Sequence, residues 1–391
     1  MVKALFLPIC LAALFGAATV HADTGEQLIT HFQCGRCHEL PAGLDPGPKR
    51  WSCLRCHQGV LRGDYDNEEG PEAAARWKAR LKSVTRTPSL AHLSGRLSSE
   101  WVAQFIRQPF HVRPRLAASM LRLPMSAEQA EVITAFLCRD QVETPSPSPT
   151  AGDPAKGLHV MHLRGCFGCH LFSGAAAPLH PPGTTAFGPN QEFAPDLRYT
   201  RNRMTPAMLA VWLDNPSHVS PGTLMPPPVV SKEDLPDVIA AISRQNLEPL
   251  PVFKEPHLEP LPRYVRFSEV KTKVIDIVCR HCHADTRVVG PEAGPGSTGG
   301  FGYAGVDMVL TSEEGVKRGL QRPGVAGRES VLSPRASGYP RIVEVMLARH
   351  REEHGVVDSE IIGMPLGLTP IPYEDIRLVL TWALQEAKNG R

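Results

Sequence analysis

Cys34-Gly-Arg-Cys37-His38 is the first of four copies of one pentapeptide, C-x-x-C-H, in this chain of 391 residues. With 10 cysteines and 16 histidines in the sequence, about 0.01 copies are expected by chance, so the four copies point to a shared chemistry. The other three are Cys53-Leu-Arg-Cys56-His57, Cys166-Phe-Gly-Cys169-His170 and Cys279-Arg-His-Cys282-His283.

The spacing within each copy suits covalent attachment of a haem. Two cysteines three positions apart can form thioether bonds to the two vinyl groups on one haem edge, and the histidine after them can bind the iron. The sequence therefore predicts four covalent c-type haems. Their expected attachment residues are Cys34, Cys37, Cys53, Cys56, Cys166, Cys169, Cys279 and Cys282, and the expected proximal ligands are His38, His57, His170 and His283.

Two other uses of paired cysteines compete with this interpretation. A thioredoxin-type redox pair gives no role to the histidine that follows every pair. A structural zinc site is the stronger competitor at the first two copies, because Cys37 and Cys53 enclose 15 residues and the region matches C-x2-C-x15-C-x2-C. Zinc would leave His38 and His57 without a role and would not explain the two isolated copies. Cys138, outside the copies, is expected to be an inert buried thiol.

The N-terminal residues are typical of a secretory signal. Lys3 gives a positive start, residues 4–20 are apolar and include Cys10, and Val20-His21-Ala22 offers a cleavage site before Asp23. We therefore predict a signal peptide over 1–22 and a periplasmic mature chain without a transmembrane segment; a retained membrane anchor is the alternative. Lys and Arg exceed Asp and Glu by only two, 42 against 40, which does not favour nucleic acid or an anionic membrane surface as partner.

Two proline-rich stretches divide the rest of the chain. We predict linkers at 142–153 and 247–262, which separate segments 23–141, 154–246 and 263–391. Each segment holds at least one C-x-x-C-H copy, and the first holds two.

Each segment repeats one order: an amphipathic helix, the pentapeptide, loops, a methionine near a proline, and a closing helix. Ser126 with Gln129 predicts a capping box for the first closing helix, and Thr205-Pro206 predicts another helix start in the second segment. No strand-rich stretch competes, so the predicted fold class is all-α. The expected opening helices are 25–32, 156–163 and 268–278, and the expected closing helices begin near 126, 231 and 373.

At these residues the chain resembles class I cytochrome c domains, which are haem-binding folds of three or more helices. In the first segment the resemblance rests on Thr87-Pro88-Ser89-Leu90, Trp101 to Pro109, Arg113-Pro114 and Met120, and in the second on Ala194-Pro195-Asp196-Leu197, Trp212 to Pro216 and Met225-Pro226. The third segment, with its long stretch between His283 and Met364, looks more like planctomycete-type cytochrome domains. The resemblance implies three tandem helical cytochrome domains.

A haem iron that only transfers electrons needs a second axial ligand, usually methionine or histidine. Met120, Met225 and Met364 each precede a closing helix and are the predicted ligands, with core packing as the alternative. Met125 lies directly before the Ser126 cap and is expected to serve helix entry instead. Core roles are expected for Met161, Met204, Met208, Met308 and Met346.

The iron on His57 lacks a methionine of its own. Its predicted sixth ligand is a histidine: His111 by preference, because it lies in the loop leading to Met120, with His92 and His31 as alternatives. Each of these histidines can instead be an ordinary core or solvated side chain. Arginines near the copies are candidates for pairing with haem propionates, with plain surface charge as the alternative; they are Arg36, Arg55, Arg113, Arg201, Arg203 and Arg280.

The predicted function is electron transfer between periplasmic or membrane-bound redox partner proteins. Two alternatives remain open at this level. One is a haem enzyme, of dihaem peroxidase or thiosulfate-oxidising type, with its substrate at the His57 iron. The other is a cytochrome subunit docked on a larger respiratory complex. The fold alone does not choose among them.

Overall fold

The computed structural model describes residues 24–46, 52–64, 85–91, 93–116, 120–139, 152–175, 189–228, 230–285, 307–322 and 325–389, with single positions 66, 71, 75 and 78. The predicted signal peptide, Cys10, His92 and most of the predicted linker 142–153 lie outside these residues. Regular structure within them is helical, and their β contacts are isolated bridges such as Asp307–Gln321. The all-α prediction is confirmed. Among the described residues, no helix has the length and apolar character needed to cross a bilayer.

Residues 24–139 form the first hydrophobic core. Ser126 and Gln129 make the predicted capping box at the start of α5, and the buried faces of α1, α4 and α5 meet around Leu28, Trp101 and Ile133. The helices of this segment are α1 (Gly25–His31), the 3-10 turn η1 (Cys34–Arg36), α2 (Cys53–Arg62), α4 (Ser99–Arg107) and α5 (Ala127–Leu137).

Residues 152–247 form the second core. Thr205 caps α9 with Pro206 at its first position, as predicted, and α6 packs along α11 around Met161, Phe172 and Ile242. Its elements are α6 (Pro154–Leu163), η4 (Cys166–Gly168), α7 (Pro189–Glu192), η5 (Leu197–Tyr199), α8 (Thr200–Arg203), α9 (Pro206–Asp214), α10 (Pro216–Val219) and α11 (Leu235–Arg244).

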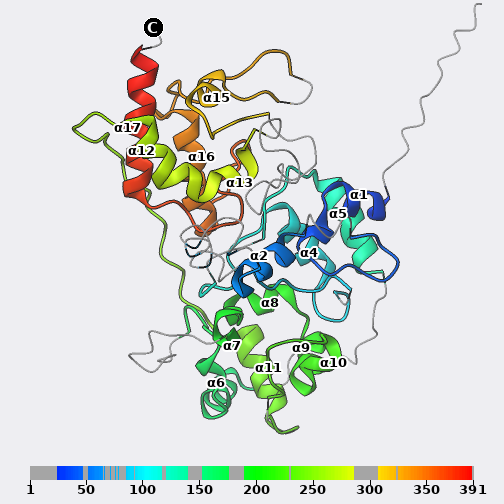
Figure 1. The fold of residues 1–391 in the computed structure, drawn as a ribbon. Coiled ribbons are helices and arrows are strands. Elements are labelled where there is room, and N and C mark those ends of the chain that lie inside the picture. The colour runs from blue at the N-terminus through cyan, green and yellow to red at the C-terminus, as the bar shows by residue number, and fades with distance from the viewer. Residues whose placement is uncertain are drawn as a thin grey trace, which may run out of the picture.

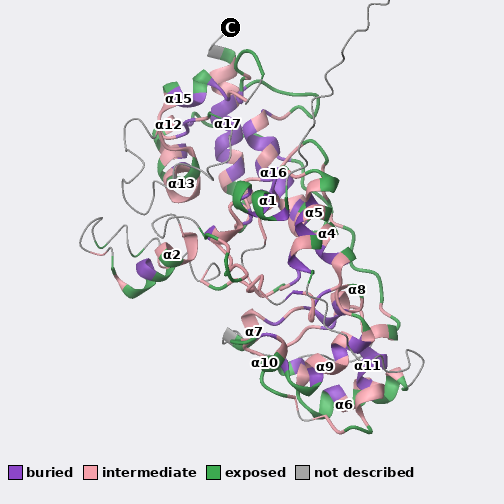
Figure 2. Ribbon diagram, turned by 90° about the vertical axis from the view of Figure 1, so that its right-hand side faces the viewer, coloured by how far each residue is buried: buried purple, intermediate pink, exposed green. Residues whose placement is uncertain are grey.

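Residues 258–384 form the third core, around Met346, Ile376 and Trp382. Its closing helix begins at Tyr373 as predicted, whereas α16 was not predicted. In Figure 2, buried residues of α11 mark the interior of the second core, and buried residues of α16 and α17 mark the interior of the third. The elements are α12 (Phe267–Val270), the π-helical η6 (Lys271–Cys279), α13 (Arg280–His283), α15 (Glu313–Arg318), α16 (Arg341–Glu353) and α17 (Tyr373–Asn389).

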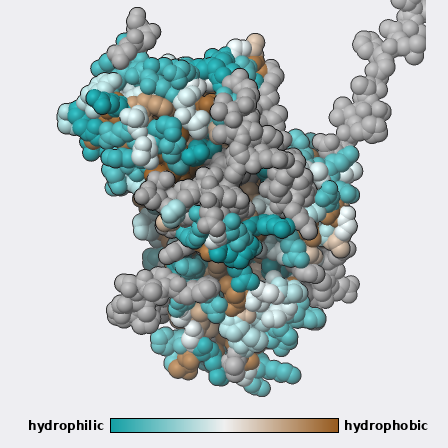
Figure 3. All heavy atoms as spheres, viewed as in Figure 1, coloured by the Kyte–Doolittle hydropathy of each residue, from teal (hydrophilic) through white to brown (hydrophobic). Residues whose placement is uncertain are grey.

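The first core lies between the other two (Figure 1). The Ser98 N–H donates to the Arg203 carbonyl at 2.8 Å, which joins the first core to the second. Arg122 joins the first core to the third, because its Nη1 donates to Glu352 Oε1 at 3.2 Å. On the face in Figure 3, the described atoms are mainly hydrophilic and the hydrophobic side chains lie interspersed among them.

The proline-rich stretch 247–262 contains no helix, but its second half is bound to the third core. Leu258 is buried there, and its N–H donates to Tyr339 Oη at 2.8 Å. The Leu261 N–H donates to Thr381 Oγ1 at 2.7 Å, and the Phe253 ring stacks on His354. This part of the predicted linker therefore serves as packed structure rather than as a free spacer.

Two glycines let the opening helices approach the closing helices. Gly25 and Gly157 both stand nine residues before the first cysteine of a pentapeptide. A Cβ at Gly25 would lie 2.3 Å from the Phe136 Cβ, and one at Gly157 would lie 1.8 Å from the Asp237 carbonyl oxygen. Both positions require hydrogen in place of a side chain, because the facing helix occupies the space.

Candidate functional site

The first and third copies of the pentapeptide have the same backbone structure. In each, the opening helix ends and one residue adopts a left-handed conformation, Gln33 at φ 54° and Gly165 at φ 73°. A 3-10 turn follows, in which the N–H groups of His38 and His170 donate to the carbonyls of Cys34 and Cys166, both at 2.9 Å. This turn presents both cysteines and the histidine from one compact loop.

The histidines of these two copies are held by one recurring arrangement. His38 Nδ1 lies 2.8 Å from the Pro88 carbonyl oxygen, and His170 Nδ1 lies 2.8 Å from that of Pro195. A carbonyl only accepts hydrogen bonds, so Nδ1 carries the proton and Nε2 keeps a lone pair. Two residues after each proline, a leucine N–H donates to the residue that follows the histidine. Burial lowers the pKa of both imidazoles, which favours the neutral form that binds metal.

In the fourth copy a backbone carbonyl also orients the histidine ring, but the backbone conformation of the copy is different. Its cysteines lie in the continuous helix formed by η6 and α13, not in a 3-10 turn. His283 Nδ1 lies 3.3 Å from the Met308 carbonyl oxygen, and the Leu310 N–H, two residues on, donates to His283 at 2.9 Å. Burial raises the pKa of Cys279 to about 12, whereas Cys282 is exposed. Met308, expected in the core, also supplies the carbonyl that orients this imidazole.

The second copy opens α2, with Ser52 as its N-cap, and lies against the first copy. Ser52 Oγ is 3.5 Å from the Arg36 carbonyl oxygen. The thiols of Cys37 and Cys53 share a hydrogen bond, which raises the pKa of Cys37 and lowers that of Cys53 to about 7. The Cys37 and Cys53 thiols of two neighbouring copies therefore lie near each other.

The zinc alternative for the first two copies finds no support in their geometry. Among the described residues, no three His, Cys, Asp or Glu side chains come together in a way that could hold a metal ion. A tetrahedral zinc site would need all four cysteines around one point. The described interaction between the two copies is that of Cys37 with Cys53.

The predicted axial methionines are all partly buried. Trp212 Nε1 in α9 donates to the Met225 sulfur at 2.9 Å. The Met364 N–H donates to the Val345 carbonyl in α16 at 2.7 Å, and this contact fixes the Met364 loop on the third core. Met125, the rejected alternative to Met120, packs against the first core. Met161 and Met346 are fully packed core residues, as expected.

The candidate sixth ligands of the His57 iron differ in their surroundings. His111 is largely buried, with 10% of its side chain exposed, and neither ring nitrogen has a hydrogen-bond partner. Its Nδ1 stands 3.7 Å from Glu353 Oε2, and burial, together with nearby arginines, lowers its pKa to about 4. A neutral buried imidazole with unsatisfied nitrogens has the properties of a metal ligand. His57 itself is partly buried.

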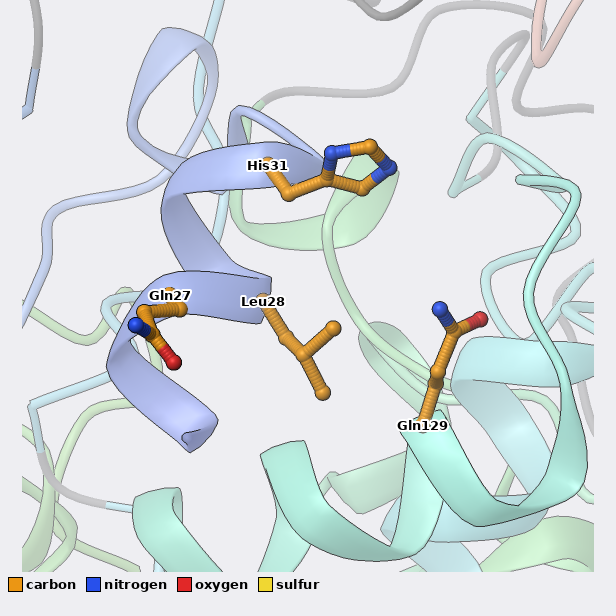
Figure 4. A pocket seen from close by; sticks show the side chains of 4 residues that line it. All are labelled: Gln27, Leu28, His31 and Gln129. Atoms are coloured by element: carbon orange, nitrogen blue, oxygen red, sulfur yellow. The ribbon is translucent and has the colours of Figure 1, made fainter. Parts of the chain in front are cut away.

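His31 has a different setting. It is exposed at the end of α1, where it lines a surface pocket with Gln27, Leu28 and Gln129 (Figure 4). Both glutamines are engaged in the helix caps of α1 and α5. The polar groups of this pocket therefore have structural roles. His92 lies outside the described residues.

Several arginines surround the two similar copies. Arg96 and Arg113 lie close to the His38 ring, and Arg203 and Arg115 lie close to the His170 ring, where their charges lower the imidazole pKa values further. Arg113 and Arg203 were among the sequence candidates, but Arg96 and Arg115 were not. Of the other candidates, Arg36 is buried beside the Cys37 and Cys53 thiols. Arg201 donates a hydrogen bond to the Gln245 carbonyl, and Arg280 has a buried Nε without a hydrogen-bond partner. Arg55 is exposed.

No family model, curated protein or solved structure matches the chain.

Proposed function

We propose that this chain is an exported c-type cytochrome with four covalent haems that transfers electrons between redox partner proteins in the periplasm. The observation that carries the proposal is the shared setting of His38, His170 and His283. In each, a backbone carbonyl accepts from Nδ1 and leaves the Nε2 lone pair available. This is the tautomer that an axial iron ligand requires.

The residues present fit a c-type haem at each copy. The paired cysteines would attach it, and His38, His57, His170 and His283 would bind the iron. Met120, Met225 and Met364 would complete three irons and His111 the fourth. When bound, each haem supplies a one-electron ferric/ferrous couple. The imidazoles and thioethers that would surround it are partly buried, and the carbonyl contacts of His38, His170 and His283 hold these rings in place, which suits electron transfer without bond making.

The three hydrophobic cores support a division into three cytochrome domains, 23–141, 154–246 and 263–391, the last of planctomycete type. Each core contains an opening helix, a pentapeptide and a closing helix, so each has the parts of a haem-binding unit. The first segment would hold two haems. The proximity of the Cys37 and Cys53 thiols supports this pairing, because adjacent attachment points favour fast transfer within one domain.

Mass spectrometry of the denatured protein tests the proposal. The expected mass is that of the chain from Asp23 plus four haems, and a Cys166→Ala/Cys169→Ala variant should lose one haem. Two haems with bound zinc would contradict the assignment of residues 34–57. Low-spin iron throughout supports electron transfer, whereas high-spin iron in the unmodified protein would favour a peroxidase-like or thiosulfate-oxidising enzyme at the His57 iron.

A further inference from the structure

Three arginines form one cluster across the boundary between the first and second cores. Arg96 and Arg113 come from the first segment and Arg203 from the second. Arg96 Nη1 donates to Ser220 Oγ of the second segment at 2.9 Å, and Arg113 Nε donates to the Phe193 carbonyl at 3.0 Å. The Arg203 guanidinium lies over the Trp101 ring of the first core, 5.2 Å from its centre. Each side chain thus crosses to the opposite segment.

The same cluster also binds the two loops whose prolines, Pro88 and Pro195, orient the histidine rings. Arg96 Nη2 donates to the Ser89 carbonyl at 3.2 Å, and Ser89 follows Pro88, whose carbonyl binds His38. Arg113 contacts Phe193, two residues before Pro195, whose carbonyl binds His170. The cluster therefore connects the two imidazoles.

The positive charge of this cluster has no carboxylate partner among the described residues. No carboxylate among the described residues lies close enough to influence Arg96, Arg113 or Arg203. Burial and its two arginine neighbours lower the pKa of Arg203 to about 9, and the buried Arg203 Nε has no hydrogen-bond partner. Arginine stays protonated in proteins, so three partly buried cations stand together and need anions.

From this arrangement we infer that Arg96, Arg113 and Arg203 form a shared carboxylate-binding site for the propionates of two haems, those of His38 and His170. The inference rests on the proposed function. Propionates are the charged groups of a haem, and guanidinium forks match carboxylates in bidentate geometry. One set of cations would then serve two haems in different domains, and binding of their propionates would hold the two domains together.

Redox titration of the holoprotein tests the inference. A cation near an iron favours the ferrous state, so Arg203→Gln should lower the midpoint potentials of both haems. We expect roughly a tenfold change in each ferrous/ferric ratio, equivalent to about 59 mV for one electron. Variants that lack either the Cys34/Cys37 or the Cys166/Cys169 pair assign each potential to its haem. Arg164→Gln is the matched control, because Arg164 belongs to the second segment but is exposed near Asp234.

Two further measurements separate propionate binding from a structural role. Arg203→Lys keeps the positive charge, so its two midpoint potentials should stay close to those of the unmodified protein. If Arg203 served packing alone, Arg203→Lys and Arg203→Gln would change the potentials equally. In Arg203→Gln the propionate pKa should rise, so both potentials should climb as the pH falls, while those of the unmodified protein stay level. Unchanged potentials, or a change at only one haem, would overturn the shared site. A count below four haems would instead overturn the proposed function.

Discussion

Gly157→Ala should destabilise the pairing of α6 with α11, although alanine is the better helix former. The new Cβ would lie 1.8 Å from the Asp237 carbonyl oxygen and 2.9 Å from the Ala241 Cβ. Backbone atoms of α11 cannot rotate aside, so the two helices must separate by more than an ångström. Overpacking of this kind costs about 3 kcal/mol, at the upper end of its usual range. The gain in helix propensity offsets about 1 kcal/mol, which leaves a net loss of about 2 kcal/mol.

Native-state hydrogen exchange of the holoprotein measures this loss where it occurs. Amides of α6 and α11 should open roughly 30-fold more often in Gly157→Ala, while those of α17 keep their protection. His159→Ala is the control, because His159 is exposed on the same helix and its replacement adds no contact. Gly25→Ala should also be destabilising, since its nearest obstacle is the Phe136 Cβ at 2.3 Å, which is fixed to the α5 backbone. Equal opening in Gly157→Ala and His159→Ala would refute the packing argument.

Three further predictions concern the proposed haem ligands and the thiols. Met225→Ala should lower the potential of one haem or open its iron to carbon monoxide, with the other three optical signals retained. His111→Ala should turn one haem high-spin. That haem should have the lowest potential in the unmodified protein, because two imidazoles favour ferric iron more than a histidine–methionine pair does. A fully low-spin spectrum of the variant would exclude His111 as the ligand. Protein produced without haem attachment should form a Cys37–Cys53 disulfide, detectable by peptide mapping, since these free thiols lie near each other.

The sequence predicted the helices that have strong local signals. The Ser126 capping box and the Thr205-Pro206 start both lie where expected, because caps act within four residues of sequence. α16 gave no such signal: it follows Pro340 without a side-chain cap and buries Glu344 and Glu352. Glu344 is paired with Arg335, and Glu352 is paired with Arg349 on the same helix and with Arg122, 230 positions away. Hydrophobic periodicity does not reveal a helix face that buries charged side chains.

The residues of the candidate site likewise fall into those that local sequence patterns reveal and those that only the folded structure brings together. The pentapeptides and their prolines are local patterns, so the candidate histidines and the Pro88 and Pro195 loops that orient two of them could be located from sequence. Arg96 could not, because nothing near it in the chain marks a haem motif. Its proximity to His38 and to Ser220 exists only in the folded molecule. The left-handed Gln33 was also hidden, since the equivalent position in the second segment is the more obvious Gly165.

Contacts between the cores limit how independent the three segments are. The first segment touches the second through Arg96 and Arg113, and the third through Arg122. Arg122 binds Glu352, whose same carboxylate oxygen accepts from the N–H of Gly363, the residue before Met364. A disturbance near Met120 can therefore reach the Met364 loop through one buried ion pair. The proline-rich stretches imply separable modules, but these contacts make the first segment the structural centre, because it binds both of the outer segments.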